Sequence, residues 1–277
     1  MFDATDRTQT LTFPAAPRRA GFIRRVAALI LREMSSTFGR SPGGFLWTVA
    51  EPVIGILLMT YLFSLALRSP PIGSSFALFY ASGVLPFTMF FDLAGKVAQS
   101  IKFSRQLLTY PVMSYLDALT ARLMLNLLVQ LLVASIILTG VIAWTASRAP
   151  VDFTQIALAV AMLAVLAFGL GTMNCFLFSM FPLWERVWAI VMRPMFLISG
   201  IFFLFDDVPE PYQSVLWFNP LTHIIGTLRH ALYSFYDVAF VSPLYVFGLG
   251  MGLTVIGLIL LNRYTLDFNN STPTRPA

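Results

Sequence analysis

Residues 193–237 of the chain read RPMFLISGIFFLFDDVPEPYQSVLWFNPLTHIIGTLRHALYSFYD, and this stretch decides the expected fold. The stretch begins inside an apolar run that extends from Ala189 to Phe205. This run is barely long enough to cross the roughly 30 Å of hydrocarbon in a bilayer. Asp206-Asp207 and Pro209-Glu210-Pro211 then stop the helix with acid and rigid backbone. The chain becomes apolar again afterwards, without reaching the length of a second span.

A short amphipathic helix is predicted after this break. Asn219-Pro220 is a strong helix start, because it places a side-chain acceptor at the cap and a proline at the first helical position. Apolar residues then recur at helical spacing: Leu221, Ile224, Ile225, Leu228, Leu232, Phe235 and Tyr236. Polar residues fall mostly on the other side: His223, Thr227, His230 and Ser234. The pattern predicts a membrane helix followed by a lid that lies at the bilayer surface or dips into it. An extramembrane loop with one surface helix is the alternative.

The composition is that of a protein that crosses a membrane several times. Of the 277 residues, 57% are hydrophobic and 11% are charged, and the mean hydropathy is +0.77, whereas soluble domains are about 25% charged. The single cysteine, Cys175, lies in an apolar run, which excludes a disulfide within the chain and disfavours a thiol-based site. The first 17 residues contain no apolar core of a cleavable signal peptide.

The expected fold class is an all-α integral membrane protein with six transmembrane helices. The spans are expected at about residues 45–67, 76–94, 123–145, 153–181, 187–205 and 243–261. One transmembrane domain is expected over residues 19–265, between tails at residues 1–18 and 266–277. From Arg18 the sequence is basic and amphipathic, which predicts an interfacial helix whose arginines point toward anionic lipid.

Lysine and arginine are distributed unequally between the two sides of this predicted bundle. Fourteen of them fall on the side that carries both termini, and three, Arg68, Arg148 and Arg229, fall on the other. By the positive-inside rule both termini are cytoplasmic and the hairpin of residues 208–237 lies outside. The net charge of +5 therefore follows topology and does not indicate a nucleic-acid surface.

Motifs for catalysis within this chain are missing. There is no GxxxxGK[ST] phosphate-binding loop, no HExxH, no CxxC and no serine elbow. His223 and His230 are two helical turns apart, too far to hold one metal ion without other ligands. A large membrane bundle without such motifs indicates passage of a substrate rather than catalysis.

A few polar and aromatic residues within the spans are candidates for a translocation path. Charge in hydrocarbon is costly, so Glu51 and Arg193 either line a hydrophilic path or pair across helices, or else lie near the interface and reach water. Trp47 and Tyr61 belong either to an interfacial aromatic belt or to the minority of aromatic rings that stack on sugars.

Three separated motifs resemble the permease subunit of capsular polysaccharide ABC exporters, of the ABC-2 type. They are FGRSPGGFLWTVAEP at the first span, RQLLTYPVMSYLDALTAR between spans two and three, and RPMFLISGIFF with VPEPYQSVLWFNPLTHIIGTLRHAL around span five. The resemblance covers about residues 22 to 265. It implies a dimer of six-span permeases bound to two cytosolic ABC ATPase subunits, which export a lipid-linked anionic capsule polymer across the Gram-negative inner membrane. It also implies that ATP and Mg²⁺ bind the ATPase partner, with no cofactor in this chain, and that a periplasmic polysaccharide co-polymerase is a further partner.

The resemblance assigns roles to two segments. The coupling element that contacts the ATPase corresponds to residues 100–110, with Ser104, Arg105, Gln106, Leu107, Leu108, Thr109 and Tyr110 as its site residues. The external gate corresponds to residues 208–237, with site residues Tyr212, Trp217, Asn219, Pro220, His223, Ile225, Leu228 and Arg229. The pair Asp206-Asp207 departs from the family pattern and leaves the polymer and the partner open.

The basic N-terminal helix suggests a cytosolic entrance. Its guanidinium groups are bidentate donors suited to the phosphate or carboxylate of a glycolipid head: Arg24, Arg25, Arg32 and Arg40. Membrane anchoring alone explains the same arginines.

Other functions remain open at this point. The chain could be an ABC-2 permease for O-antigen, teichoic acid or a drug. It could also be a membrane-embedded glycosyl- or acyltransferase that uses His223 or His230 as base. A secondary transporter is disfavoured, because midplane acids and inverted repeats are not evident.

Overall fold

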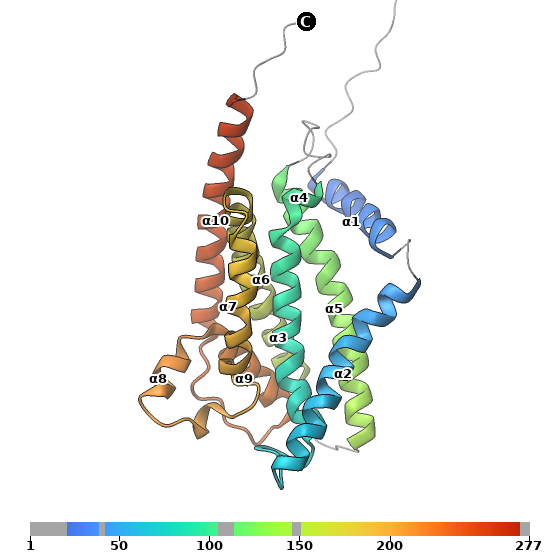
Figure 1. Cartoon of the computed structure of the whole chain (residues 1–277), viewed down its shortest axis with the longest axis vertical. Coiled ribbons are helices and arrows are strands. Elements are labelled where there is room, and N and C mark those ends of the chain that lie inside the picture. The colour runs from blue at the N-terminus through green and yellow to red at the C-terminus, as the bar shows by residue number, and fades with distance from the viewer. Residues whose placement is uncertain (1–20, 39–41, 105–113, 146–150, 272–277) are drawn as a thin grey trace, which may run out of the picture.

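The computed structural model describes residues 21–38, 42–104, 114–145 and 151–271 of the chain (Figure 1). Within these residues the regular secondary structure is helical throughout. The helices are α1 (Phe22–Phe38), α2 (Pro42–Ala66), α3 (Phe76–Ala98), α4 (Ser100–Ser104), α5 (Tyr115–Thr145), α6 (Phe153–Met180), α7 (Trp184–Ile198), the 3₁₀ helix η1 (Phe205–Asp207), α8 (Tyr212–Trp217), α9 (Pro220–Leu232) and α10 (Pro243–Ser271).

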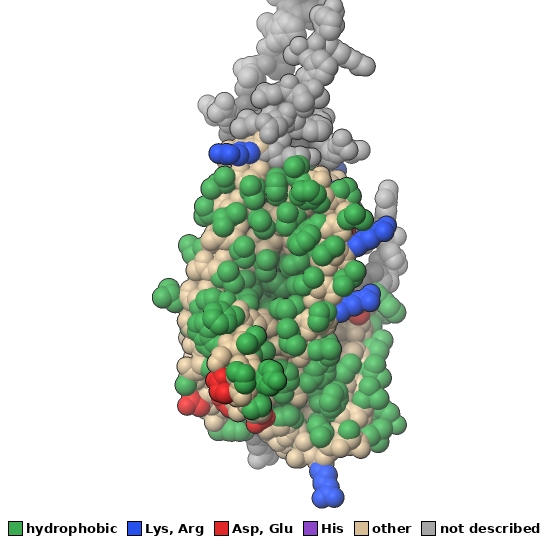
Figure 2. Space-filling view, turned by 60° about the vertical axis from the view of Figure 1, so that its left-hand side comes forward, with side chains coloured by type: hydrophobic (Ala, Val, Ile, Leu, Met, Phe, Trp, Pro, Cys, Tyr) green, Lys and Arg blue, Asp and Glu red, His purple; other side chains and the backbone are tan. Residues whose placement is uncertain are grey.

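Five of these helices, α2, α3, α5, α6 and α10, are long and apolar enough to cross a membrane. They overlap five of the six predicted spans, so the expectation of a helical protein with several membrane helices is confirmed. The surface agrees with this, because Figure 2 shows a face covered mostly by hydrophobic side chains, with acidic side chains gathered at the lower end.

The predicted fifth span differs from the structure at its end. The helix α7 stops at Ile198, seven residues before the expected Phe205. Its 15 residues give a length of about 22 Å, short of the bilayer's hydrocarbon thickness. Gly200, with a φ of +81°, follows in the left-handed region that favours glycine and turns the chain out of the helical path. The prediction of a helix through residue 205 is therefore wrong.

Helix α3 is the centre of the bundle. About 78% of its apolar window is buried, because α2, α5, α6 and α9 all pack against it. Its side chains Phe79, Tyr80 and Leu93 have no exposed surface. In contrast, only 6% of the α2 window is buried, and Met192 is the only buried residue of α7.

Helices α6 and α10 make a very close contact through glycine. A Cβ atom added to Gly250 would lie 2.9 Å from the carbonyl oxygen of Val165, and one added to Gly257 would lie 2.8 Å from the amide nitrogen of Met173. Small residues of this kind let two helix backbones approach inside a membrane, where packing rather than water exclusion drives association.

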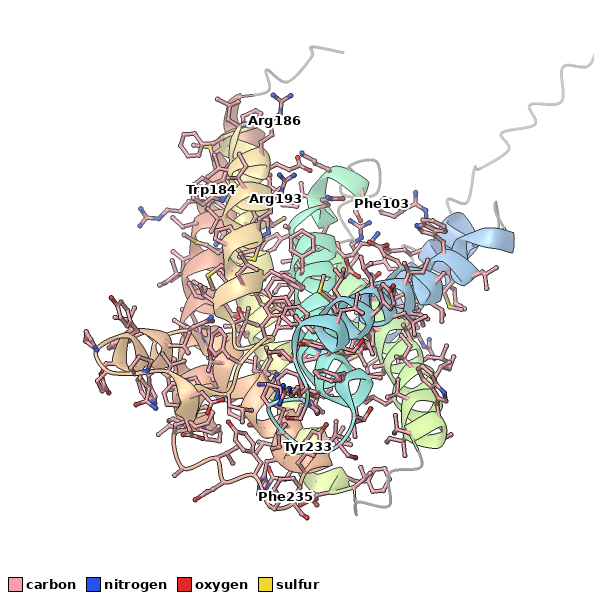
Figure 3. The ribbon with its side chains drawn as sticks, turned by 60° about the horizontal axis from the view of Figure 1, so that its bottom comes forward. Phe103, Trp184, Arg186, Arg193, Tyr233 and Phe235 are labelled. Atoms are coloured by element: carbon pink, nitrogen blue, oxygen red, sulfur yellow. The ribbon has the colours of Figure 1, made fainter. Side chains whose placement is uncertain are left out.

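The two ends of the bundle carry different elements. Helices α1 and α4 lie at the end from which α10 runs toward the C-terminus, and α8 and α9 lie at the opposite end (Figure 1). Figure 3 shows the same division in side chains: Phe103, Trp184 and Arg193 lie toward the first end, and Tyr233 and Phe235 toward the second.

Candidate functional site

The predicted start of the hairpin helix is confirmed. Asn219 caps α9 by accepting a hydrogen bond from the amide of Leu221 at 3.1 Å, and Pro220 occupies the first helical turn. The Asn219 amide also donates to the Ser199 hydroxyl at 3.2 Å. The cap therefore fixes the start of α9 against the segment that follows α7.

The environment of α9 differs from the prediction. Ile225 and Leu228 are buried as expected, but the opposite side is buried as well, since Thr227 is 2% exposed and His223 has no exposed surface. The reason is that α9 packs between α3 and α6 on one side and the residues that lead into α10 on the other. The expectation of a polar face in contact with water is wrong, and α9 is a core helix of the protomer.

His223 makes structural hydrogen bonds with both ring nitrogens. Its Nδ1 accepts from the amide of Ser242 at 3.2 Å, so Nε2 carries the proton and donates to the Trp217 carbonyl at 2.8 Å. Burial lowers the pKa of the imidazole, against an opposing effect of the hydrogen bond to Trp217. Both nitrogens are thus engaged, which removes the basis for His223 as a catalytic base.

His230 also contacts a backbone carbonyl through one ring nitrogen: its Nδ1 lies 2.7 Å from the Tyr236 carbonyl oxygen. Among the described residues no group of three or more His, Cys, Asp or Glu side chains could hold a metal ion.

Aromatic contacts bind α8 to the beginning of α10. The Trp217 indole donates to the Phe240 carbonyl at 2.9 Å, and its ring centroid lies 5.1 Å from that of Tyr245. The Tyr245 hydroxyl donates to the Phe218 carbonyl at 2.7 Å. Tyr212, at the start of α8, is exposed. These three contacts fix α8 to the segment that leads into α10, while Val215, Phe218 and Phe235 remain exposed.

Arg229 explains how the chain tolerates the early end of α7. Its guanidinium donates to the carbonyl oxygens of Ile201 and Phe203, each at 2.9 Å, and lies 4.2 Å from the centroid of the Phe79 ring. Non-helical backbone at membrane depth needs partners within the protein, and Arg229 supplies them while being only 2% exposed. From the sequence we expected Arg229 to be a charged residue of the external gate. In the structure it lies inside the protomer.

A second polar site joins α1 to α5 at the other end. Arg25 forms a two-pronged ion pair with Asp117, at 2.7 Å from Nε and 3.3 Å from Nη2. Asp117 is 1% exposed and also accepts from the amide of Ser114 at 3.0 Å, which caps the start of α5. The fork of Arg25, which we expected to bind a lipid head, is directed at this carboxylate.

Arg122 connects four elements at the same end. Its Nε lies 2.8 Å from Glu33 of α1, its Nη1 donates to the Lys96 carbonyl at the end of α3, and its guanidinium lies 4.3 Å from the Phe103 ring of α4. Both side chains of the Arg122–Glu33 pair are buried. Glu33, Asp117 and Arg122 were not predicted as site residues. The signal in the sequence was their charge, in segments that flank the predicted spans on the side of the termini.

The remaining predicted residues are placed as follows. Arg24 and Arg32 are exposed on α1, and Ser104 is buried at the end of α4. Arg40 and the coupling residues Arg105 to Tyr110 lie outside the described residues. Lys102 of α4 pairs with Glu185 of α7 at 2.6 Å in an exposed salt bridge.

The predicted path residues lie on the two least buried helices. Trp47 and Tyr61 on α2 are 66% and 63% exposed, and Glu51 on α2 and Arg193 on α7 are exposed as well. A polar cavity of about 260 Å³ between α3, α6 and α7 is lined by Asp92, Lys96, Gln99, Glu185 and Trp188, among others. The described structure brings none of the four path residues into this cavity.

A comparison with protein families matches the ABC-2 type transporter family over residues 24–233. The chain is also similar to the polysialic acid transport protein KpsM of Escherichia coli, with 30% identity over 87% of this chain and 95% of the relative. It is 24% identical to the capsule polysaccharide export inner-membrane protein CtrC of Neisseria meningitidis serogroup A, over 87% of this chain and 91% of the relative. It is 22% identical to the O-antigen export system permease protein RfbA of Klebsiella pneumoniae, over 87% of this chain and 90% of the relative. These matches confirm the resemblance noted from the three sequence motifs.

Proposed function

The chain belongs to the ABC-2 type transporter family, and we propose that it is the membrane subunit of an exporter that moves lipid-linked capsular polysaccharide from the cytoplasm to the periplasm. The observation that carries this proposal is the similarity to capsule and polysialic acid export proteins over 87% of the chain. The five helices that are long and apolar enough to cross a membrane support a role in passage. Helix α7 also runs from the end of α6 toward the opposite end of the bundle, so α1 and the end of α10 lie at the same end (Figure 1). Export of O-antigen is a second candidate, favoured by the weaker similarity to an O-antigen permease.

The proposed orientation places both termini in the cytoplasm of a Gram-negative bacterium. Arg229 is buried within the protomer, so it no longer counts as an outer loop charge. Arg122 is buried as well, so thirteen basic residues then stand against two, Arg68 and Arg148, and this supports the same orientation. On this assignment α1 and α4 are cytosolic, and α8 and α9 lie at the periplasmic end.

The proposed partners are a second copy of the chain, two cytosolic ATPase subunits and a periplasmic co-polymerase. Helices α2 and α7 expose most of their side chains, Trp47 and Arg193 among them, which favours a pore between two copies. ATP and Mg²⁺ bind the ATPase in this proposal, and the segment 100–110 receives its force. The exposed acidic side chains of Asp206, Asp207 and Glu210 belong to the outer surface available to the co-polymerase.

The test is ATP-dependent transfer of labelled polymer in proteoliposomes. The chain is reconstituted with its ATPase partner, and radiolabelled lipid-linked capsule polymer or O-antigen is offered on the ATPase side. The proposal requires that the capsule polymer becomes protected from an added glycosidase only when ATP is hydrolysed. An ATPase variant that binds but does not hydrolyse ATP is the control.

Two results would redirect the assignment. Transfer of O-antigen but not capsule polymer would select the second candidate. Chemical modification of the polymer in vesicles that lack any ATPase would support a transferase.

A further inference from the structure

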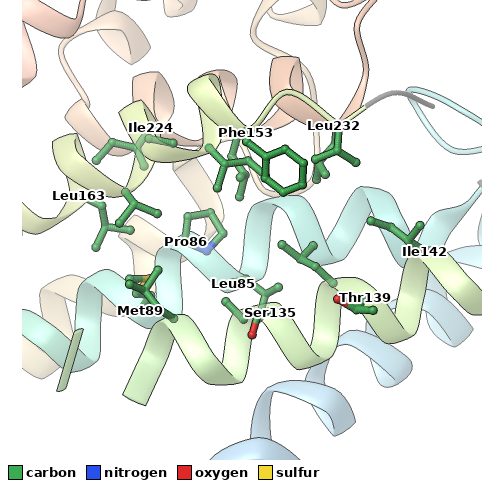
Figure 4. A pocket seen from close by; sticks show the side chains of 18 residues that line it. Leu85, Pro86, Met89, Ser135, Thr139, Ile142, Phe153, Leu163, Ile224 and Leu232 are labelled. Atoms are coloured by element: carbon green, nitrogen blue, oxygen red, sulfur yellow. The ribbon is translucent and has the colours of Figure 1, made fainter. Parts of the chain in front are cut away.

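A cavity of about 290 Å³ lies between α3, α5 and α6, and α9 forms one of its walls (Figure 4). Leu85 comes from α3, Leu138 from α5, Ile156 and Leu163 from α6, and Ile224 and Leu228 from α9. Helices α5 and α6 both qualify as membrane spans. The cavity is thus part of the membrane-embedded body and is separate from the polar cavity beside α7.

The lining of this cavity is unsuited to water. The cavity has room for roughly ten water molecules at liquid density, and each of them would need two to four polar partners. The polar side chains among its lining residues are two hydroxyls of α5, Ser135 and Thr139, and the Ser135 hydroxyl already donates to the Leu132 carbonyl at 2.8 Å. Apolar cavities of this kind stay dry and accept hydrocarbon ligands.

The exposure of the lining residues shows where the cavity opens. Ser135 and Thr139 on α5 are exposed, whereas Ala159 and Leu163 on α6 are 3% and 2% exposed. The mouth therefore lies along α5 and beside Phe153 at the start of α6, which is 78% exposed, and the deep end is formed by Ala159 and Leu163 of α6 with α3. Because α5 is long and apolar enough to cross the membrane, we take the medium at the mouth to be the hydrocarbon of the bilayer and not water.

We propose that this cavity binds one acyl chain of a bilayer phospholipid, which enters beside α5 and packs against Ile224, Leu228 and Leu232 of α9. Among the residues that the structure describes, no charged side chain lines the cavity, so these residues offer nothing to a phosphate, a sugar or any particular headgroup. The cavity therefore recognises the acyl chain alone, and the bulk phospholipid around α5 is the source of that chain in this proposal. The acyl chain fills the space beside α9, whose residues Leu228 and Leu232 are already buried at 7% and 2% exposed.

The test uses the purified full-length chain in nanodiscs that contain a phosphatidylcholine with a diazirine at the middle of one acyl chain. After illumination, mass spectrometry maps the sites of crosslinking. We expect enrichment on the lining residues of α5 and α6 relative to Leu128 and Leu132, which are exposed on α5 outside the cavity. We expect the same pattern with a phosphatidylglycerol probe, because the site recognises the chain alone.

Two substitutions block the cavity in different ways. Ala159→Phe fills its deep end, and Thr139→Phe closes its mouth from an exposed position that does not disturb the fold. Each is expected to reduce crosslinking at the lining residues to the level of Leu128. Ala143→Phe, exposed on α5 outside the lining, is the matched control and keeps the wild-type pattern.

Several outcomes overturn the proposal. Uniform crosslinking along the outer faces of the spans means that no chain is held in the cavity. Crosslinking at the lining that survives both blocking substitutions means that it does not report the cavity. A pattern that changes with the headgroup assigns the site to another occupant. None of these measurements depends on transport, so they are independent of the proposed substrate.

Discussion

Removing Glu33 should leave a buried guanidinium without its carboxylate. Glu33→Met keeps the length and helix propensity of the side chain, but Arg122, which is 6% exposed, then retains only the Lys96 carbonyl and the Phe103 ring as described partners. Breaking a buried pair by deleting one partner costs about 3 to 5 kcal/mol. For a chain of this size we expect the melting temperature to fall by about 6 to 20 °C.

The double variant Glu33→Met, Arg122→Met should recover much of this loss. Replacing both members of a buried ion pair by apolar groups is often neutral, because the desolvation of both charges is avoided. We therefore expect the double variant to melt above Glu33→Met, although it also loses the contacts of Arg122 with Lys96 and Phe103. The sign of this difference separates a buried ion pair from ordinary packing.

The chain provides its own reporter for the assay. Cys175 is the only cysteine and has no exposed surface, so a thiol-reactive fluorogenic dye reacts with it when the bundle opens. The control is Lys102→Met, which breaks the exposed pair with Glu185. Such pairs contribute about 0 to 1 kcal/mol, so its melting temperature should fall by less than about 4 °C. The reasoning is refuted if Glu33→Met melts together with this control, or if the double variant melts below Glu33→Met.

Three further predictions concern the proposed exporter. Leu228→Glu and Thr227→Glu should both make proteoliposomes leak a small dye without ATP, because both side chains are buried and each substitution places an unpaired carboxylate in the core. If vesicles with Thr227→Glu do not leak, the Thr227 side of α9 faces water. In a cysteine-free background, a cysteine at Ser214 should react with an impermeant maleimide from the periplasm and one at Lys102 should not, since both positions are exposed and lie at opposite ends of the bundle; reversed labelling would invert the orientation. Arg105→Glu should lower export while the protein remains in the membrane, and normal export in this variant would remove the coupling role from this position.

The sequence predicted those features that depend on local signals. The membrane helices follow from the length of apolar runs, which no soluble core of this size requires. The start of α9 follows from Asn219-Pro220, because capping needs only neighbours in the sequence. Burial of Cys175 follows from its apolar surroundings.

Features that depend on distant neighbours were not predictable in this way. Periodicity divides α9 into two faces, but it does not show that Ser242, from a segment 19 residues away, contacts His223 on the polar one. The pair Arg25–Asp117 joins residues 92 positions apart, and each alone is typical of a solvated surface. The backbone that follows α7 is stabilised by Arg229, which donates to the carbonyl oxygens of Ile201 and Phe203 from a position 26 or more residues later in the sequence. In each case a side chain bonds to a backbone group or a charge that lies far away in the sequence, so a local sequence pattern does not reveal the contact.

The burial of α9 limits how a channel in this protein can open. A lid that rests on a surface swings on a hinge and exposes little, but rotation of α9 alone would strip the carbonyls of Ile201 and Phe203 of Arg229 and expose His223. Both losses of hydrogen bonds occur inside one protomer, where a passing substrate forms no contacts that would compensate for them. The helix therefore travels with α3 and α6 as part of one rigid body. In the proposed dimer we therefore expect the aperture to widen by sliding or tilting of whole protomers along their shared boundary, with a width set by that displacement and not by the length of the hairpin.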